Sequence, residues 1–329
     1  MGTMDRIKHI GVFTSGGDAP GMNAAIRAVV RTAHFYGLQV SGILEGYNGL
    51  VQNNIRPLGT RDVSNIIQRG GTILRSARSK EFMTVEGRCA AKRTMDLHGI
   101  DALIAIGGDG TFRGAQAFMV EHGVRMVGIT GTIDNDMGGT DTTIGFDTAT
   151  NTAMELVDRI RDTASSHDRL FFVEVMGRSS GAIAMYCGIA AGAEFVMVPE
   201  RKQGIEELIS ALERTEKSKS SVIVIVAEGD EEGGAYEVAR KVKERYAHYE
   251  TRVSVLGHVQ RGGNPTVADR MLASRSGVAA VEALLAGQAG VMVGQVNGRM
   301  VLTSFSEVLS GTSPRNHAEL DRILAILST

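Results

Sequence analysis

Two short motifs of glycine and aspartate are the residues of this chain best suited to chemistry on phosphate groups. The first is GGDGT at 107–111 and the second is GTIDND at 131–136, and each follows an apolar run. Phosphoryl transfer needs backbone close to phosphate oxygens, a carboxylate that holds Mg²⁺ and a carboxylate that accepts a hydroxyl proton. The two motifs can supply all three from the ends of consecutive predicted strands.

The first motif places Asp109 between glycines, just before a helical pattern. Glycines allow close approach to the phosphates of a nucleotide, and a carboxylate is a hard oxygen ligand for Mg²⁺. The motif is neither a Walker A loop nor the spaced dinucleotide fingerprint. An aspartate among glycines is often only a turn, but its position between a strand and a helix favours a phosphate site.

The second motif sets Asp134 and Asp136 two residues apart. In extended backbone, side chains at this spacing point to the same side. One carboxylate could then act as the base toward a substrate hydroxyl, while the other orients it or helps to hold the metal. The alternative interpretation is a pair of Asx turns.

A third constellation is TSGGDAPGMN at 14–23, where a predicted strand ends and a helix begins. The exposed N–H groups and the positive end of that helix would attract phosphate, although a plain turn capped by Asp18 explains the pattern equally well. On the helix, Arg27 and Arg31 lie on one face at i,i+4 spacing. Helix periodicity by itself favours a solvated face there over an anion clamp.

Basic residues form a fourth group, beginning with Arg169 and Arg178 and ending with Arg252, His258 and Arg261. Arginines at strand ends can hold a phosphate through two parallel hydrogen bonds. Each of them alone is more often a surface ion-pair partner, and a single histidine is more often structural.

Short β-branched runs alternate with longer helical patterns, which is typical of βαβ units around a parallel sheet. In such sheets ligands bind beyond the carboxyl ends of the strands, where the motifs fall. The alternation continues in the second half, so we expect a second domain from near Gly145, with a cleft between the halves. Strands are expected at 7–14, 40–44, 102–106, 126–130, 170–175, 195–198, 221–227 and 252–256, and helices at 20–35, 111–121, 149–163, 205–217, 235–246 and 265–286.

The composition is that of a soluble globular protein, with 329 residues, 43% of them apolar and 22% charged. A formal charge of -2, with scattered basic residues, argues against nucleic acid or an anionic membrane as a partner. The chain shows neither a signal peptide nor an apolar run of spanning length, so we expect a cytoplasmic protein. Cys89 and Cys187 are then expected to be reduced thiols.

Eight ordered segments resemble one family, the bacterial-type ATP-dependent 6-phosphofructokinases, from about residue 7 to about residue 290. They are TSGGDAPGMNAAIR, IIQRGGTIL, IGGDGT, GTIDND, RDTASSHDR, VEVMGR, AGAEF and VLGHVQRGGNP. The resemblance implies an α/β fold of two Rossmann-like three-layer domains with mainly parallel sheets and the active site in the cleft between them. It implies an ATP-binding domain at 1–144 plus about 259–308, and a sugar-phosphate domain at 145–258 plus about 309–329.

The resemblance implies transfer of the γ-phosphoryl group of Mg-ATP to the 1-hydroxyl of fructose 6-phosphate, the committed step of glycolysis. Asp109 would hold Mg²⁺, Asp134 would take the proton with Thr132 and Asp136 beside it, and Arg178 would stabilise the transferred group. The implied ATP ligands are Gly17, Arg78, Ser79, Gly108, Asp109, Gly110 and Thr111. The implied sugar-phosphate ligands are Thr132, Asp134, Arg169, Met176, Gly177, Arg178, Glu228, Arg252, His258 and Arg261, with Arg169 and Arg252 coming from a neighbouring subunit of a homotetramer.

The family also implies an effector site for ADP or phosphoenolpyruvate between subunits, which replaces the solvated-face interpretation of the first helix. The matching positions are Arg27, Arg31, Arg161, Glu194, Lys217 and Lys219. Thr60 stands where a basic residue is expected in the neighbouring-subunit arm, and Arg61 is its possible substitute. A second departure is Thr130, where the family usually has proline; we expect little consequence from it.

Donor choice follows from size. Pyrophosphate-using relatives carry aspartate at the position of Gly110 and lysine at that of Gly131, so the two glycines favour ATP. Two alternatives stay open: a NAD or lipid kinase, which shares GGDGT, and a nucleotide-sensing subunit without turnover. The segments at 176–178 and 257–263 argue against the first, and the presence of all three aspartates argues against the second.

Overall fold

A computed structural model describes residues 7–164, 169–201, 204–215, 222–245, 250–310 and 318–327. The chain divides into two compact units. The first contains the described residues of Met1–Ile133, Met137–Asp147 and Arg261–Pro314, and the second those of Asp134–Asp136, Thr148–Gln260 and Arg315–Thr329.

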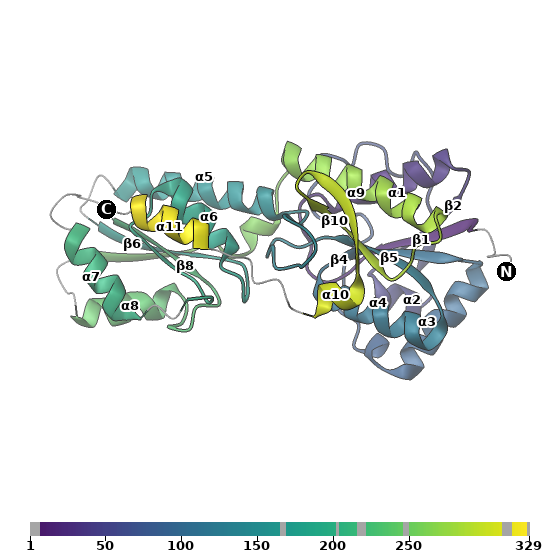
Figure 1. Cartoon of the computed structure of the whole chain (residues 1–329), viewed down its shortest axis with the longest axis horizontal. Coiled ribbons are helices and arrows are strands. Elements are labelled where there is room, and N and C mark those ends of the chain that lie inside the picture. Colours follow the sequence, from purple (N-terminus) through teal and green to yellow (C-terminus); the bar gives the residue numbers. More distant parts are fainter. Residues whose placement is uncertain are drawn as a thin grey trace. The chain divides into compact units, whose positions relative to one another are not determined.

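The first unit is built on a seven-stranded sheet of order β11-β10-β5-β4-β1-β2-β3. Its strand pairs are parallel except the two at the edges, β10 with β11 and β2 with β3. Helices α1 and α9 cover one face of this sheet, and α2, α3, α4 and α10 cover the other (Figure 1). The strands are β1 (His9–Thr14), β2 (Gln39–Ile43), β3 (Ile55–Pro57), β4 (Ala102–Gly107), β5 (Arg125–Thr130), β10 (Val291–Val296) and β11 (Arg299–Ser304); the helices are α1 (Met22–Phe35), α2 (Tyr47–Val51), α3 (Val85–His98), α4 (Asp109–His122), α9 (Val267–Leu285) and α10 (Phe305–Leu309).

The second unit is built on a four-stranded parallel sheet of order β7-β8-β6-β9. Helices α5, α6 and α11 lie on one side of it, and α7 and α8 on the other (Figure 1). Apolar side chains of β6 and β8 are buried at consecutive positions, as expected for strands covered on both faces. The strands are β6 (Arg169–Val175), β7 (Phe195–Met197), β8 (Val222–Ala227) and β9 (Glu250–Val255); the helices are α5 (Phe146–Ala164), α6 (Ala182–Ala191), α7 (Ile205–Thr215), α8 (Ala235–Arg245) and α11 (Ala318–Leu327).

This architecture confirms the predicted α/β class with mainly parallel sheets, and each predicted strand and helix is present. Other elements were missed. Helix α6 is apolar on all sides and most of its residues are buried, so it has no amphipathic period to detect. The hairpin of β10 and β11 turns at Asn297 and Gly298, both at positive φ, and this Asn-Gly pair was an available signal.

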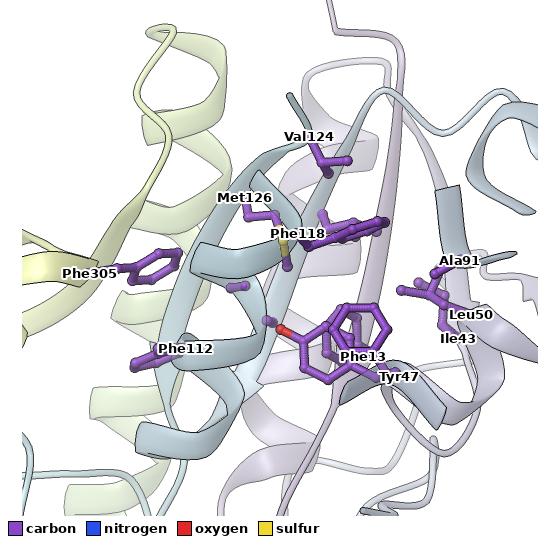
Figure 2. Close-up of a cluster of buried hydrophobic side chains, with 14 of the residues drawn as sticks. Phe13, Ile43, Tyr47, Leu50, Ala91, Phe112, Phe118, Val124, Met126 and Phe305 are labelled. Carbon is purple, nitrogen blue, oxygen red and sulfur yellow. The ribbon is translucent and has the colours of Figure 1, made fainter. Parts of the chain in front are cut away.

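A cluster of buried hydrophobic side chains, several of them aromatic, lies between the first sheet and helices α2, α3, α4 and α10 (Figure 2). The ring of Tyr47 stacks on Phe82 at 4.0 Å and lies 4.8 Å from Phe13. The Tyr47 hydroxyl donates to the carbonyl of Thr111 at 2.7 Å, and burial raises its pKa well above the ordinary value. The phenol is therefore a permanent donor that ties the GGDGT motif to the core.

Replacing Phe118 with alanine should lower the free energy of unfolding by about 3–5 kcal/mol, because its ring is fully buried and a cavity would remain. Val120 on the same helix is 81% exposed and provides the matched control, with an expected change for Val120→Ala within about 0.5 kcal/mol. Urea unfolding followed by circular dichroism measures both. Equal midpoints for the two variants would contradict the burial of this ring.

Candidate active site

The loop after β1 leads into α1, and no side chain caps the N-terminus of this helix. The N-cap of α1 is Gly21, at φ 108°, and no side chain caps the helix, so the alternative of a turn capped by Asp18 is wrong. Gly16 also has positive φ, at 88°, and its carbonyl accepts a hydrogen bond from the Ser76 hydroxyl. The loop is thus held from the side, and the first residues of α1, Met22 and Asn23, are buried.

The GGDGT motif spans the end of β4 and the first turn of α4. The N-cap Gly108 has no side chain to offer, and the N–H groups of Asp109 and Gly110 find no acceptor among the described residues. A Cβ on Gly107 would lie 2.5 Å from the carbonyl oxygen of Ser15, so only glycine lets the two loops touch. Free N–H groups at a helix start are a ready site for a phosphate.

Asp109 fits a metal that arrives with a nucleotide. Its side chain is 48% exposed, and its nearest charged neighbour is Nε of Arg113 at 3.7 Å. No group of three potential metal ligands from His, Cys, Asp and Glu occurs in the described part of the chain. Mg²⁺ usually takes one or two protein carboxylates and completes its shell with phosphate and water. A single carboxylate at the first turn of α4 therefore suits this ion.

The GTIDND motif departs from the expected geometry. Asn135 has φ 52°, a left-handed conformation, so the backbone between the two aspartates is not extended. Asp134 is buried, with 3% exposure, while Asp136 is exposed. The prediction that an extended strand aims both carboxylates to one side is therefore wrong. Thr132 is buried in the first unit, and its carbonyl accepts the Thr143 hydroxyl at 2.7 Å.

Residues Arg78 and Ser79 lie in the segment that follows Ser76. Arg78 is exposed, and the Ser79 hydroxyl accepts the N–H of Phe82 at 3.2 Å. Because Ser76 bonds to Gly16, this segment runs beside the loop after β1. The structure thus brings the predicted ATP ligands together at one edge of the first sheet.

In the second unit, the loop Met176–Arg178 follows β6 and is shaped by Glu228. Oε1 of Glu228 accepts the N–H groups of Gly177 at 3.3 Å and Arg178 at 2.7 Å. Both residues have positive φ, 144° and 54°, which bends the loop sharply. The Met176 N–H reaches Oε1 of the fully buried Gln260 at 3.4 Å. Sequence reasoning missed Gln260, although it lies inside the segment VLGHVQRGGNP.

Arg169 and Arg252 lie on neighbouring strands, β6 and β9, and both contact Glu250. Nε of Arg169 is 3.0 Å from Oε2 of Glu250, and Nη2 of Arg252 contacts Oε1. Glu250 was not predicted as a site residue. His258 lies in the short 3₁₀ helix Gly257–Arg261 after β9.

Arg261 belongs to the first unit, in which its guanidinium donates to the carbonyl of Asp18 at 3.0 Å. A Cβ on Gly17 would lie 2.8 Å from Nη1 of this arginine. The structure therefore places this predicted sugar-phosphate ligand beside the glycines of the loop after β1.

Of the predicted effector residues, Arg27 and Arg31 lie on α1, and no ion pair of either is present among the described residues. Burial and the neighbouring charge of Arg31 lower the pKa of Arg27. In the second unit Arg161 donates to the carbonyl of Ala191 at 2.6 Å, and the buried Glu194 accepts the N–H of Ile223 at 2.7 Å. Lys217 and Lys219 lie outside the described residues.

The comparison with known families decides the relationship. The model of the family described as phosphofructokinase matches residues 9–284. The chain belongs to this family. The match of the phosphofructokinase model runs through both units and includes every predicted site residue.

Two curated phosphofructokinases illustrate how similar the relatives are. A Thermus thermophilus protein named ATP-dependent 6-phosphofructokinase 1 is 56% identical over 325 residues, which is 97% of this chain and 100% of that protein. A Bacteroides thetaiotaomicron protein named ATP-dependent 6-phosphofructokinase 2 is 53% identical over 94% of this chain and 96% of its own length.

Among solved structures, Pichia pastoris phosphofructokinase in the T-state superposes with a TM-score of 0.88 and 37% identity. The superposition covers 100% of this chain and 39% of the yeast chain, so our protein spans about two fifths of that relative. Within the part of our phosphofructokinase that the structure describes, no helix combines the length and apolar character needed to cross a membrane.

Proposed function

We propose that this protein is an ATP-dependent 6-phosphofructokinase that converts fructose 6-phosphate and ATP into fructose 1,6-bisphosphate and ADP. The observation that carries the proposal is the first turn of α4, where the Asp109 carboxylate lies beside two backbone N–H groups without an acceptor among the described residues. The chain that carries this turn belongs to the phosphofructokinase family. The relatives named as ATP-dependent enzymes support ATP as the donor. A cytoplasmic location is part of the proposal.

We assign ATP binding to the first unit. The domain proposed for ATP consists of residues 1–144 plus about 259–308, which lie mostly in this unit. Gly17, Arg78, Ser79 and the loop Gly108–Thr111 would contact the nucleotide, with phosphate oxygens on the free N–H groups of α4. Asp109 would hold Mg²⁺, which when bound neutralises charge on the β- and γ-phosphates. The space beside Gly110 is open, and this supports a donor as large as ATP. A Cβ on Gly131 would instead lie 3.0 Å from Cε of Met22, so this second glycine does not provide the open space that was predicted there.

In the catalytic step, Asp134 would accept the proton of the sugar 1-hydroxyl as that oxygen attacks the γ-phosphorus. Its burial supports this role over Asp136, because a carboxylate shielded from bulk water keeps a fixed orientation toward its substrate. Thr132 and Asp136 would help to orient the reacting groups. Arg178 would stabilise the negative charge on the phosphoryl group during transfer.

We assign binding of the sugar phosphate to the second unit. The domain proposed for this ligand consists of residues 145–258 plus about 309–329, which lie mostly in this unit. Met176, Gly177, Glu228 and His258 of this unit would contact fructose 6-phosphate, and Arg261 of the first unit is assigned to the same ligand. Arg169 and Arg252 would hold its 6-phosphate from a neighbouring subunit, because paired guanidinium groups suit phosphate oxygens. A homotetramer that completes each site across an interface is thus part of the proposal.

A donor and acceptor panel tests the proposed function. The purified full-length protein is assayed for ADP release with Mg-ATP and fructose 6-phosphate, NAD or diacylglycerol, and for fructose 1,6-bisphosphate formation with pyrophosphate replacing ATP. We expect turnover only with ATP and fructose 6-phosphate, and only in the presence of Mg²⁺. Turnover with NAD or lipid alone, or no turnover with any pair, would refute the assignment.

Regulation through α1 is the second part of the proposal. Arg27 and Arg31 repel one another and have no ion-pair partner among the described residues, which supports an anionic effector such as ADP or phosphoenolpyruvate there, together with Arg161, Glu194, Lys217 and Lys219.

The double substitution Arg27→Ala and Arg31→Ala should remove at least about 90% of the response to ADP or phosphoenolpyruvate, because each arginine contributes a charge-assisted bond. Its kcat without effector should stay within about twofold of the unsubstituted enzyme, since α1 effector residues do not contact the substrates in this proposal. Rates at subsaturating fructose 6-phosphate, with and without effector, measure this. A full response in the double variant would place the effector elsewhere.

A further inference from the structure

Glu250 lies between the two arginines assigned to the 6-phosphate of the sugar. It is the first residue of β9, it pairs with Arg169 in the register of β6 and β9, and Arg252 follows two positions later on the same strand. Oε2 is 3.0 Å from Nε of Arg169, and Oε1 contacts Nη2 of Arg252. Each carboxylate oxygen is thus taken by a different guanidinium group.

The charges around this carboxylate keep it ionised. The hydrogen bond from Arg169, followed by the positive charges of Arg169 and Arg252, lowers the pKa of Glu250 below its ordinary value. The side chains of Arg169, Arg252 and Glu250 are 23%, 47% and 50% exposed, so an anion from solution can reach the same guanidinium groups.

This arrangement differs from an ordinary surface ion pair. Arg240 on α8 also has two charged partners, Glu237 and Glu244, but these lie one helical turn away on the same helix. Glu250 instead joins arginines of two strands and bonds to a residue 81 positions away. An exposed ion pair adds little to the stability of a protein. We therefore expect Glu250 to affect the affinity of the two arginines for a ligand.

We propose that Glu250 sets the affinity for the sugar phosphate by competing with its 6-phosphate for Arg169 and Arg252. The inference rests on the proposed function, which assigns these arginines to the substrate. An incoming phosphate must either displace the carboxylate or bind beside it. In both cases the negative charge of Glu250 repels the negative charge of the ligand and weakens its binding. The rate of the phosphoryl-transfer step is not affected.

The test is Glu250→Gln in the full-length enzyme. An exposed ion pair shifts an equilibrium by up to about fivefold, so the loss of two should lower KM for fructose 6-phosphate by about three- to tenfold. The kcat and the KM for ATP should stay within about twofold, since Glu250 contacts no reacting group in this proposal. Inorganic phosphate, as a competitive inhibitor against fructose 6-phosphate, should bind more tightly by a similar factor.

Glu237→Gln is the matched control, because it also removes one exposed carboxylate from the second unit, 2.9 Å from an arginine. Glu237→Gln should leave KM for fructose 6-phosphate unchanged. Glu250→Asp keeps a carboxylate at this position, so its KM should stay close to that of the unsubstituted enzyme. An unchanged or raised KM in Glu250→Gln overturns the role of Glu250.

Arg252→Ala separates this inference from the proposed function. A raised KM for fructose 6-phosphate in that variant, with an unchanged KM in Glu250→Gln, overturns the competition and leaves the sugar-phosphate assignment in place. An unchanged KM in Arg252→Ala overturns both.

Discussion

Replacing Asp134 with asparagine is expected to lower kcat by about 10²- to 10⁴-fold, the contribution of a positioned general base. Asparagine has nearly the same shape as aspartate and fits the buried position, but its amide cannot take the proton of the sugar hydroxyl. Asp134→Ser should show a loss of the same order. Because the base acts mainly in the transition state, binding of fructose 6-phosphate, measured by calorimetry, should stay largely intact.

Asp141→Asn is the control for this experiment. Asp141 is an exposed aspartate a few residues further along the chain, and its carboxylate accepts the N–H of Asn297 at 2.7 Å. Its substitution should leave kcat unchanged. Turnover of Asp134→Asn equal to that of Asp141→Asn would remove the role of base from Asp134.

The second large effect is expected from Gly110→Asp, which should lower kcat/KM for ATP by about 10²- to 10⁴-fold. A new carboxylate in the first turn of α4 would meet the phosphates of ATP, and like charges placed together at a binding site cost several kcal/mol. A Cβ at Gly110 has no heavy atom within 4 Å, so the fold itself should accept the side chain.

Gly110→Ala provides the matched control, because it adds a Cβ to the same open space without a charge. Initial rates at varied ATP and saturating fructose 6-phosphate, with thermal unfolding of each variant, separate a local effect from a loss of structure. Equal losses in the alanine and aspartate variants would attribute the effect to size and contradict the electrostatic argument.

Much of the fold could be predicted because it depends on local patterns. The consecutive apolar residues of β4 and β5, each followed by a glycine motif, indicate parallel strands that end at one edge. Elements without a period, such as α6, left no such pattern. Helix α3 has a clear N-cap, Thr84, whose hydroxyl accepts the N–H of Gly87, yet this signal was not used in the prediction.

The sequence by itself determined the α/β class, the family and the positions of the Gly-Asp motifs at strand ends. The tertiary structure decided that Asp134 is buried while Asp136 is exposed, that Glu228 and Gln260 shape the loop Met176–Arg178, and that Glu250 contacts two arginines. The physical reason is the same in each case. The burial of one carboxylate, and hydrogen bonds between residues far apart in the chain, arise only when the strands are packed side by side.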